Sequence, residues 1–213
     1  MKITLMSDTH AMHGQLDIPD GDLFIFAGDM THCRTARDVE DFNRFLGRLP
    51  HEHKVVIGGN HDHRLALDKE NAKAMLSEGT YLQDEQVVIK SVKIYGAPWQ
   101  PLFNNLACDA FALQRGEPLR QKWGLIPDDV DILVTHTPPA GILDLDGPVG
   151  HGCFDLTEAL RRVKPSYHIF GHVHSNHGMV KSNGTCFINC NIQGPNGTLR
   201  KPLTLDYETG ILK

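Results

Sequence analysis

Histidines stand close together in the stretch IFGHVHSNHG, residues 169–178, directly after two apolar residues and a glycine. Two of them, His172 and His174, are two positions apart, so they lie on the same side of an extended segment. Imidazole nitrogens, joined by carboxylate and amide oxygens, are ligands that suit Mn, Fe or Zn. This stretch therefore indicates a metal centre at the end of a buried strand.

Four other apolar runs also end at side chains that can bind metal ions. The runs are KITLM, DLFIFA, KVVI and DILVT, and they lead to Asp8 and His10, to Asp29, to Asn60 and His61, and to His136. Each run is rich in Ile, Val, Leu or Phe, as in a strand that is buried on both faces. In open α/β sheets, functional groups collect at the carboxyl ends of the strands, because the loops there converge on one crevice. We therefore expect all five strand ends to form one site.

The number of these groups indicates two metal ions. The five strand ends supply eight candidate ligands. One ion binds only about four to six ligands, whereas two ions that share a bridging carboxylate could use all eight. Each motif alone has a simpler explanation: Asp8 before Thr9 is common in turns, GNHD could be a loop with positive φ, and His136 could be a hydrogen-bonded core residue. The order of the five motifs, each at a strand end, favours the metal site.

Segments with helical periodicity separate the apolar runs. Residues 35–50 place apolar side chains at helical spacing, with Thr35 as the N-cap and Asp38 in the first turn. Residues 68–79 predict a second helix that ends at Gly79 in a left-handed conformation. This alternation of strands and helices predicts an α/β fold.

The second half of the chain has weaker patterns. Residues 155–165 predict a third helix with Asp155 as its N-cap. The segments 178–190 and 202–213 predict hairpins around SNG and ETG. Residues 98–123 are the least regular part of the chain and predict a long loop with a short helix.

The composition predicts a single-domain cytoplasmic protein. Hydrophobic residues make up 40% of the chain, and no repeat, low-complexity segment or linker interrupts it, so we expect one domain over residues 1–213. A net charge of −5 argues against a surface for duplex nucleic acid. Five cysteines without a CxxC motif argue against a disulfide framework and indicate a reducing compartment. Neither a signal peptide nor an apolar run of about eighteen residues is evident, so no membrane partner is expected.

The ordered motifs DTH, GD, GNHD, TH and GHVH resemble those of the calcineurin-like metallophosphoesterase superfamily. Residues 43–62, 93–104 and 123–139 resemble the small subfamily of metallophosphoesterase domain-containing proteins that is linked to cyclic nucleotide hydrolysis. The resemblance covers nearly the whole chain. It implies a four-layer α/β/β/α sandwich with mixed sheets and an active site at the C-terminal ends of the strands.

The resemblance also implies roles for the strand-end residues. The implied ligands are Asp8, His10 and His174 for the first ion, Asn60, His136 and His172 for the second ion, and Asp29 as the bridge. His61 matches the family's catalytic histidine, and Asp62 would orient a histidine from behind. Some members of the subfamily lack the first histidine of the last motif, and this chain keeps His172, so we expect a competent enzyme. The cofactors would be two metal ions, with Mn or Fe favoured over Zn.

Together these residues predict a dinuclear metal-dependent phosphodiesterase for small phosphodiesters, with cyclic nucleotides favoured by the subfamily resemblance. A metal-bridged hydroxide would attack phosphorus, and His61 would protonate the leaving group, since imidazole titrates near about 6.5. Two alternatives stay open. One is a phosphomonoesterase or protein phosphatase that uses the same site, and the other is a nucleotide-binding scaffold with residual catalysis.

Four further residues are candidates for contacts with the substrate. Trp99 and Phe103 lie on a proline-rich loop and could stack a nucleobase, or the loop could pack into the core. Arg34 and Arg64 follow the Asp29 and Asn60 motifs and could hold a phosphate or ribose. Either arginine could equally be a surface cation.

Overall fold

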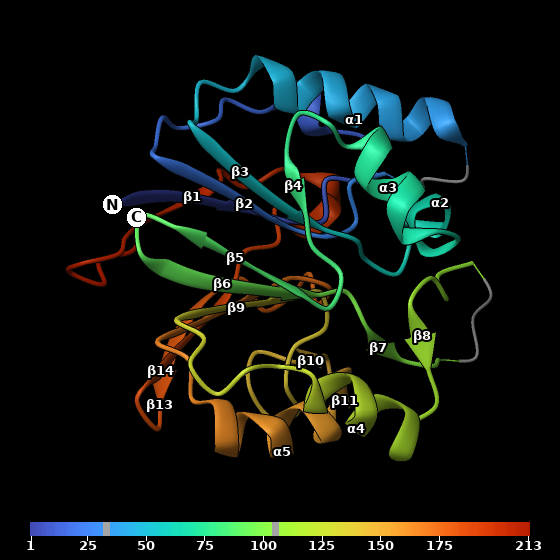
Figure 1. The fold of residues 1–213 in the computed structure, drawn as a ribbon, viewed down its shortest axis with the longest axis vertical. Helices are drawn as coiled ribbons and strands as arrows, with labels where there is room; N and C mark the ends of the chain where they lie inside the picture. Colours follow the sequence, from blue (N-terminus) through green and yellow to red (C-terminus); the bar gives the residue numbers. More distant parts are fainter. Residues whose placement is uncertain (32–34, 104–106) are drawn as a thin grey trace.

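Two mixed β-sheets lie face to face between two layers of helices in the computed structural model, which describes residues 1–31, 35–103 and 107–213 (Figure 1). The first sheet has the strand order β15 (Leu203–Asp206), β1 (Lys2–Met6), β2 (Leu23–Ala27), β3 (His53–Ile57) and β4 (Thr80–Tyr81). The second has the order β13 (Gly178–Ser182), β14 (Thr185–Asn189), β12 (Tyr167–Phe170), β9 (Ile132–Thr135), β6 (Val92–Ala97) and β5 (Glu85–Ile89). The five apolar runs form β1, β2, β3, β9 and β12, which confirms them as strands.

The inner strands of both sheets run parallel, and the edge strands β15, β13 and β5 are antiparallel, while the edge strand β4 is parallel. In the first sheet β1, β2, β3 and β4 pair in parallel, while β15 is antiparallel to β1. In the second, β6, β9, β12 and β14 pair in parallel, while β5 and β13 are antiparallel edge strands. Neighbouring parallel strands therefore end at the same edge of each sheet, where the motif residues follow.

Alternation along each strand builds the layers. In β2, Leu23 and Ile25 face the second sheet, where they pack in one core with Ile132 and Ile169. Phe24, between them, points to the other face and packs in a second core that contains residues of the first helix. A third core joins the second sheet to its own helices. These three apolar layers produce the four-layer α/β/β/α sandwich, as predicted.

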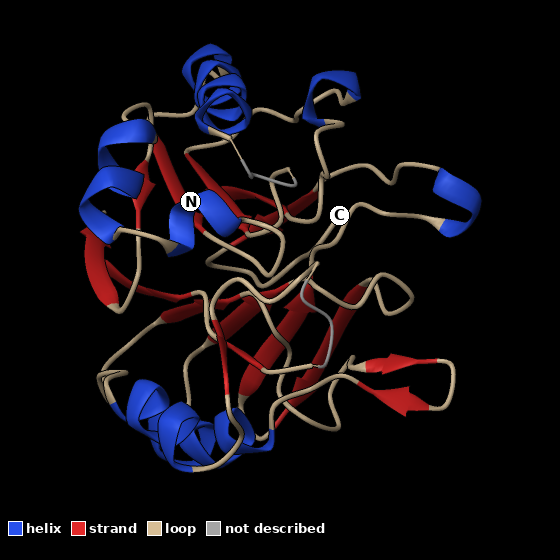
Figure 2. Cartoon of the chain, turned by 90° about the vertical axis from the view of Figure 1, so that its right-hand side faces the viewer, coloured by secondary structure: helices blue, strands red, loops and turns tan. Residues whose placement is uncertain are grey.

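Helices cover the outer face of each sheet, which Figure 2 shows from the side. The helices α1 (Ala36–Arg48), α2 (His63–Ala66) and α3 (Lys69–Met75) lie on the first sheet, and α4 (Glu117–Gly124) and α5 (Phe154–Val163) lie on the second. At the start of α1, Thr35 is the N-cap expected from the sequence, and it forms a reciprocal capping box with Asp38.

Two helix ends differ from the prediction. The helix α3 ends at Met75, not at Gly79, because the chain must turn before it starts β4 at Thr80. Gly79 is not among the described residues with positive φ, so the predicted left-handed stop is wrong. The helix α5 begins two residues earlier than predicted, with Cys153 in place of Asp155 as its N-cap. Asp155 instead accepts a hydrogen bond from the backbone N–H of Gly116, at the start of α4.

Short elements fill the loops. They are the 3-10 turns η1 (His13–Gln15) and η2 (Pro195–Gly197), the pair β7 (Gln100–Pro101) and β8 (Ala112–Leu113), and the hairpin of β10 (Leu145–Asp146) and β11 (Val149–Gly150). The irregular region 98–123 thus contains a strand pair as well as the helix expected there. The predicted SNG hairpin is β13–β14, and the ETG turn brings Leu212 opposite Leu205.

None of the helices within the described ranges has the length and apolar character needed to cross a membrane.

A buried histidine in β12 couples the fold to pH. The Thr135 hydroxyl donates to the Thr137 carbonyl, so it accepts from Nε2–H of His168, at 2.8 Å. Nδ1 of His168 is buried and has no hydrogen-bond partner among the described residues. Burial lowers the pKa of His168 from 6.5 to about 3. The side chain is therefore neutral in the folded protein.

We predict that the free energy of unfolding of the metal-free protein falls as the pH falls from 6.5 to 3. In that window the unfolded chain binds a proton at His168 and the folded protein does not. One such group contributes a slope of up to about 1.4 kcal/mol per pH unit. Urea unfolding of the wild type and His168→Gln between pH 4 and 7 should show a shallower slope in the variant. Equal slopes would contradict a neutral buried His168.

Candidate metal centre

The carboxyl ends of the five central strands converge on one site. Within the described part of the chain, ligand atoms that lie within 4.8 Å of one another form three overlapping groups. The groups are Asp8, His10 and His174; His10, Asp29 and His61; and Asp8, Asp29 and His136. The structure thus brings together residues from β1, β2, β3, β9 and β12 that are up to 166 positions apart in the chain (174 − 8).

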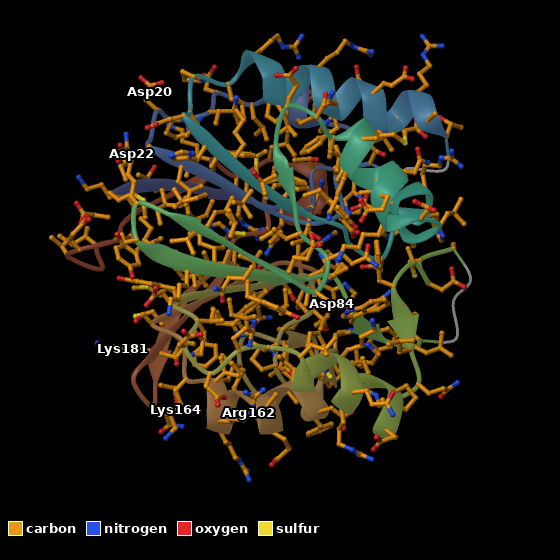
Figure 3. The ribbon with its side chains drawn as sticks, in the orientation of Figure 1. Asp20, Asp22, Asp84, Arg162, Lys164 and Lys181 are labelled. Carbon is orange, nitrogen blue, oxygen red and sulfur yellow. The ribbon has the colours of Figure 1, made fainter. Side chains whose placement is uncertain are left out.

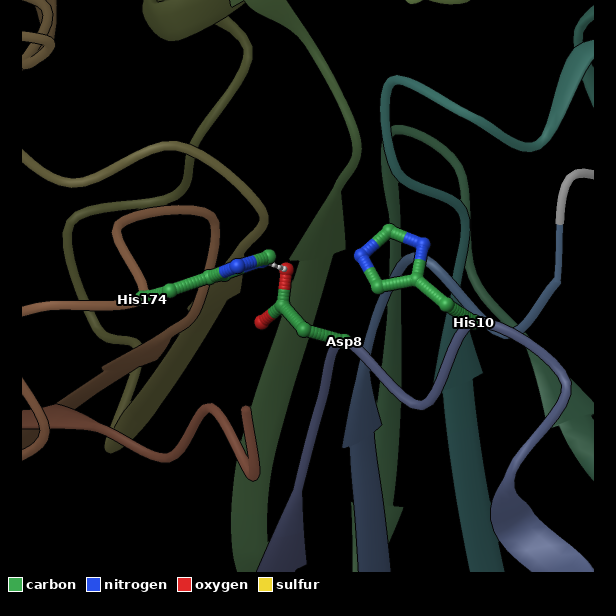
Figure 4. Close-up of side chains that lie close together, drawn as sticks. All are labelled: Asp8, His10 and His174. Atoms are coloured by element: carbon green, nitrogen blue, oxygen red, sulfur yellow. Dashed lines mark ion pairs between the residues drawn. The ribbon is translucent and has the colours of Figure 1, made fainter. Parts of the chain in front are cut away.

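Asp8 lies between two histidines in the first part of the site. Figure 4 shows the rings of His10 and His174 on either side of the Asp8 carboxylate. Nε2 of His174 is 3.5 Å from Oδ1 of Asp8. The ring centroids of His10 and His174 are 5.4 Å apart. Burial opposes ionisation of Asp8, but the hydrogen bond from His174 and the charge of His136 lower its pKa. The Asp8 carboxyl group between the two imidazole rings is therefore ionised, although it is buried.

Asn60 joins two other histidines in the second part of the site. Its Oδ1 is 2.7 Å from Nε2 of His136 and 2.8 Å from Nδ1 of His172. Asp29 connects the two parts: its Oδ2 is 3.4 Å from Nε2 of His136 and 3.8 Å from Nε2 of His10. One carboxylate oxygen therefore lies near a nitrogen from each part.

The hydrogen bonds of His136 test whether these residues fit a cation. Nδ1–H of His136 donates to the Ala27 carbonyl at 2.8 Å, so the lone pair of the neutral ring is on Nε2. That lone pair points at the acceptor Oδ1 of Asn60, which is unfavourable unless a proton or a cation lies between them. Burial would lower the pKa of His136, but the charge of Asp29 raises it to about 9. The site therefore attracts positive charge, and a divalent cation fits its donor atoms.

Backbone strain accompanies the site. Positive φ angles of 57°, 43°, 59° and 68° occur at Asp8, His10, Asp29 and His172. Such conformations are uncommon outside glycine, cost about 1–3 kcal/mol each, and gather at functional sites. These backbone conformations direct each side chain from the end of its strand into the shared crevice.

Close backbone approach also shapes the site. A Cβ atom on Gly171 would overlap the Asp8 carboxylate, and one on Gly59 would overlap the Asp29 carboxylate. The glycines of the GHVH and GNHD motifs are therefore needed because two loops approach the carboxylates without room for a side chain.

Asp62 holds two loops together beneath the site. Its buried Oδ2 accepts hydrogen bonds from the backbone N–H of Asp29, at 2.9 Å, and of Gly59, at 2.8 Å. Asp62 therefore fixes the loop that carries Asp29 against the loop that carries Asn60. The expected contact with a histidine ring stays a prediction.

A cleft of about 340 Å³ opens in front of these residues. Its lining consists of Asp29, Asn60, His61, Phe103, Cys108, Asp146, His151, His172, Val173 and His174. Sequence reasoning missed Cys108, Asp146 and His151: Cys108 and His151 lie on loops, Asp146 ends the short strand β10, and none of them follows an apolar run. Burial raises the pKa of Cys108, so it lines the cleft as a neutral thiol. The ring of His151 is 6.2 Å from that of His172.

Only one of the two candidate aromatic residues lines the cleft. Phe103 stacks on His172, with ring centroids 6.0 Å apart. Trp99 instead donates from Nε1 to Asp84, and the Lys122 ammonium lies 4.0 Å above its ring. The loop at Trp99 therefore packs into the core, which is the alternative that the sequence left open.

Arg64, one of the two candidate arginines, is not part of this lining. Arg64 is half-buried in α2, and its Nε has no hydrogen-bond partner among the described residues. Arg34 lies outside the described residues.

A cluster of polar residues holds the GHVH loop from behind. Arg200 donates from Nη1 to the carbonyl of His174 at 3.0 Å and to Oδ1 of Asn191 at 2.8 Å. Asn189 and Asn191 both donate to the Val173 carbonyl, at 2.9 and 3.0 Å. The loop that carries His172 and His174 is thus fixed by the last residue of β14 and by residues that follow this strand.

The fold and the site define a metallophosphoesterase. Residues 1–176 match the model of the calcineurin-like phosphoesterase family, so the chain belongs to this family. The family depends on a pair of metal ions, and the chain is a hydrolase of phosphoric esters.

Relatives span nearly the whole chain. The human metallophosphoesterase domain-containing protein 1 is 35% identical, over 98% of this chain and 71% of its own length. A UPF0046 protein of Caenorhabditis elegans is 39% identical, over 89% of this chain and 69% of its own length.

Solved structures share the fold at low sequence identity. One crystal structure covers 100% of this chain and 97% of its own, with a TM-score of 0.72 and 15% identity. A structure described as a novel archaeal phosphodiesterase covers 100% of this chain and 98% of its own, with a TM-score of 0.53 and 16% identity.

We predict that Arg200→Ala weakens Mn²⁺ binding about tenfold, because contacts behind a ligand contribute that much to metal affinity. Isothermal titration of the chelator-stripped protein measures the change, and Arg200→Lys should restore part of the affinity. Arg161→Ala serves as the control, since Arg161 is exposed on α5 and pairs with Glu158. Equal affinities of Arg200→Ala and Arg161→Ala would show that the loop needs no support from Arg200.

Proposed function

We propose that this protein is a dinuclear metal-dependent phosphodiesterase that hydrolyses small phosphodiesters, with cyclic nucleotides favoured. In this proposal Asp8, His10 and His174 bind the first ion. Asn60, His136 and His172 bind the second, and Asp29 bridges the two. Mn or Fe would occupy the site, and the enzyme would act as one domain in the cytoplasm.

The position of Asp29 is the observation that carries this proposal. Its Oδ2 lies within 3.8 Å of a histidine nitrogen from each ligand set. Burial opposes ionisation of Asp29, but the charges of His136, His10 and His61 lower its pKa far below the ordinary value. A buried carboxylate that stays ionised between two sets of donors is what a bridge between two cations requires.

Bound there, two cations would neutralise charge on the phosphoryl oxygens and lower the pKa of water from about 15.7 towards about 7. Protonation of the leaving group would fall to a residue beside the cations. His61 lines the cleft, and its backbone N–H donates to Oδ1 of Asp29 at 2.9 Å. We assign its imidazolium the role of donating a proton to the leaving oxygen as the phosphorus–oxygen bond breaks.

The preference for cyclic nucleotides rests on the resemblance to the metallophosphoesterase domain-containing proteins and on the shape of the cleft. Phe103 and His151 form an aromatic wall beside His172, with Phe103 and His151 ring centroids 5.8 Å apart. Such a wall suits a flat base next to a phosphate held by the cations.

We predict that the chelator-stripped protein is inactive and that Mn²⁺ restores hydrolysis, because the site has the donors for two cations. Initial rates on bis(p-nitrophenyl) phosphate and p-nitrophenyl phosphate, at equal concentration, should favour the diester. A panel of 2′,3′- and 3′,5′-cyclic nucleotides then identifies the substrate. Faster hydrolysis of the monoester would favour a phosphomonoesterase. Tight nucleotide binding without turnover in either assay would favour a binding scaffold.

We also predict that His61→Ala keeps its bound Mn²⁺ but loses about a hundredfold or more in turnover of a ribose ester, whose leaving group is a poor one. The loss on the activated nitrophenyl diester should be below about tenfold, since nitrophenolate leaves without a proton. His53→Ala, in β3 away from the cleft lining, is the control. Equal losses on both esters would contradict proton donation, and loss of Mn²⁺ would make His61 a ligand.

A further inference from the structure

The hairpin of β10 and β11 brings a carboxylate into the wall of the cleft. Asp146, the last residue of β10, lines the cleft together with His151, the first residue after β11. Neither residue belongs to the strand-end motifs. The hairpin therefore adds a separate surface to the cleft, beside His172.

Hydrogen bonds from the histidine loop fix this hairpin in place. The Leu145 carbonyl accepts from Oγ of Ser175 at 2.8 Å and also from the side-chain amide of Asn176. At the base of the hairpin, the His151 N–H donates to the Asp144 carbonyl at 2.8 Å. Asp146 is thus held beside the loop that carries His172 and His174.

The charge of this wall is unusual for a cleft that holds phosphate esters. Its lining, within the described residues, contains no lysine or arginine. Among the described residues, the Asp146 carboxylate has no ion-pair or hydrogen-bond partner, while its backbone pairs with Val149. The Arg115 guanidinium lies behind this wall, 5.7 Å from the Phe103 ring centroid, so Asp146 is the charge that the hairpin itself presents to an anionic substrate.

We infer that Asp146 makes the cleft selective for monoanionic phosphodiesters over dianionic phosphomonoesters. This inference rests on the proposed function, and it names the residue that gives the enzyme its preference for diesters over monoesters. A dianion meets about twice the repulsion from Asp146 that a monoanion meets, since Coulomb energy scales with the product of the charges. Because Asp146 is exposed, salt screens the effect, and we expect about a fivefold contribution to selectivity at low ionic strength.

The test compares Asp146→Asn with the wild type, both loaded with Mn²⁺. The kcat/KM ratio of bis(p-nitrophenyl) phosphate to p-nitrophenyl phosphate should fall about fivefold in the variant, mainly because the monoester reacts faster. In 0.5 M NaCl the difference between wild type and variant should shrink. Asp20→Asn is the matched control, since it removes the same charge from an exposed residue before β2, at the amino end of the strands (Figure 3).

Ligand binding provides a second measurement that needs no turnover. Calorimetric titration at pH 8 with inorganic phosphate, largely a dianion there, and with dimethyl phosphate, a monoanion, should show tighter phosphate binding to Asp146→Asn. The dimethyl phosphate affinity should change less. An unchanged ratio of the two dissociation constants would refute the role of Asp146, and so would weaker Mn²⁺ binding by the variant. Failure of the wild type to hydrolyse either ester would instead refute the proposed function.

Discussion

Burial of the Asp29 carboxylate is the constraint on which the rest of the site depends. An ionised carboxylate out of contact with water is costly unless charge and hydrogen bonds compensate it. Here the compensation comes from three other strand ends: His10 after β1, His61 after β3 and His136 after β9. The two sheets can therefore close over Asp29 only in a register that brings these loops together. The packing of the two sheets and the assembly of the site therefore depend on the same contacts.

The strand-end residues could be predicted because the signals are local. Apolar runs of strand length with alternating inward and outward side chains define β1, β2, β3, β9 and β12. A ligand-type residue directly after each run must then lie at the carboxyl edge. The capping box of α1 was predictable for the same reason, since Thr35 and Asp38 are three positions apart.

The remaining features depend on contacts between distant segments. Arg200 supports His174 across 26 positions (200 − 174), and nothing near either residue indicates the contact. Asp155 has the chemistry of an N-cap, but the loop before α4 uses its carboxylate. Trp99 and Phe103 are both aromatic residues of the same predicted loop. Trp99 donates a hydrogen bond to Asp84, whereas Phe103 lines the cleft. The positive φ angles likewise appear only once the loops are packed.

The site has two halves of different construction, and this has an evolutionary consequence. The rear half is made of strand ends, strained loops and the polar cluster around Arg200, each of which depends on the others. The front wall, with Phe103, Asp146 and His151, consists of a loop and the β10–β11 hairpin, which carry no proposed metal ligand. Mutations in that wall can redirect the enzyme to new esters while its hydrolytic machinery stays whole. A lineage with this architecture can diversify its chemistry by drift in a few loop positions.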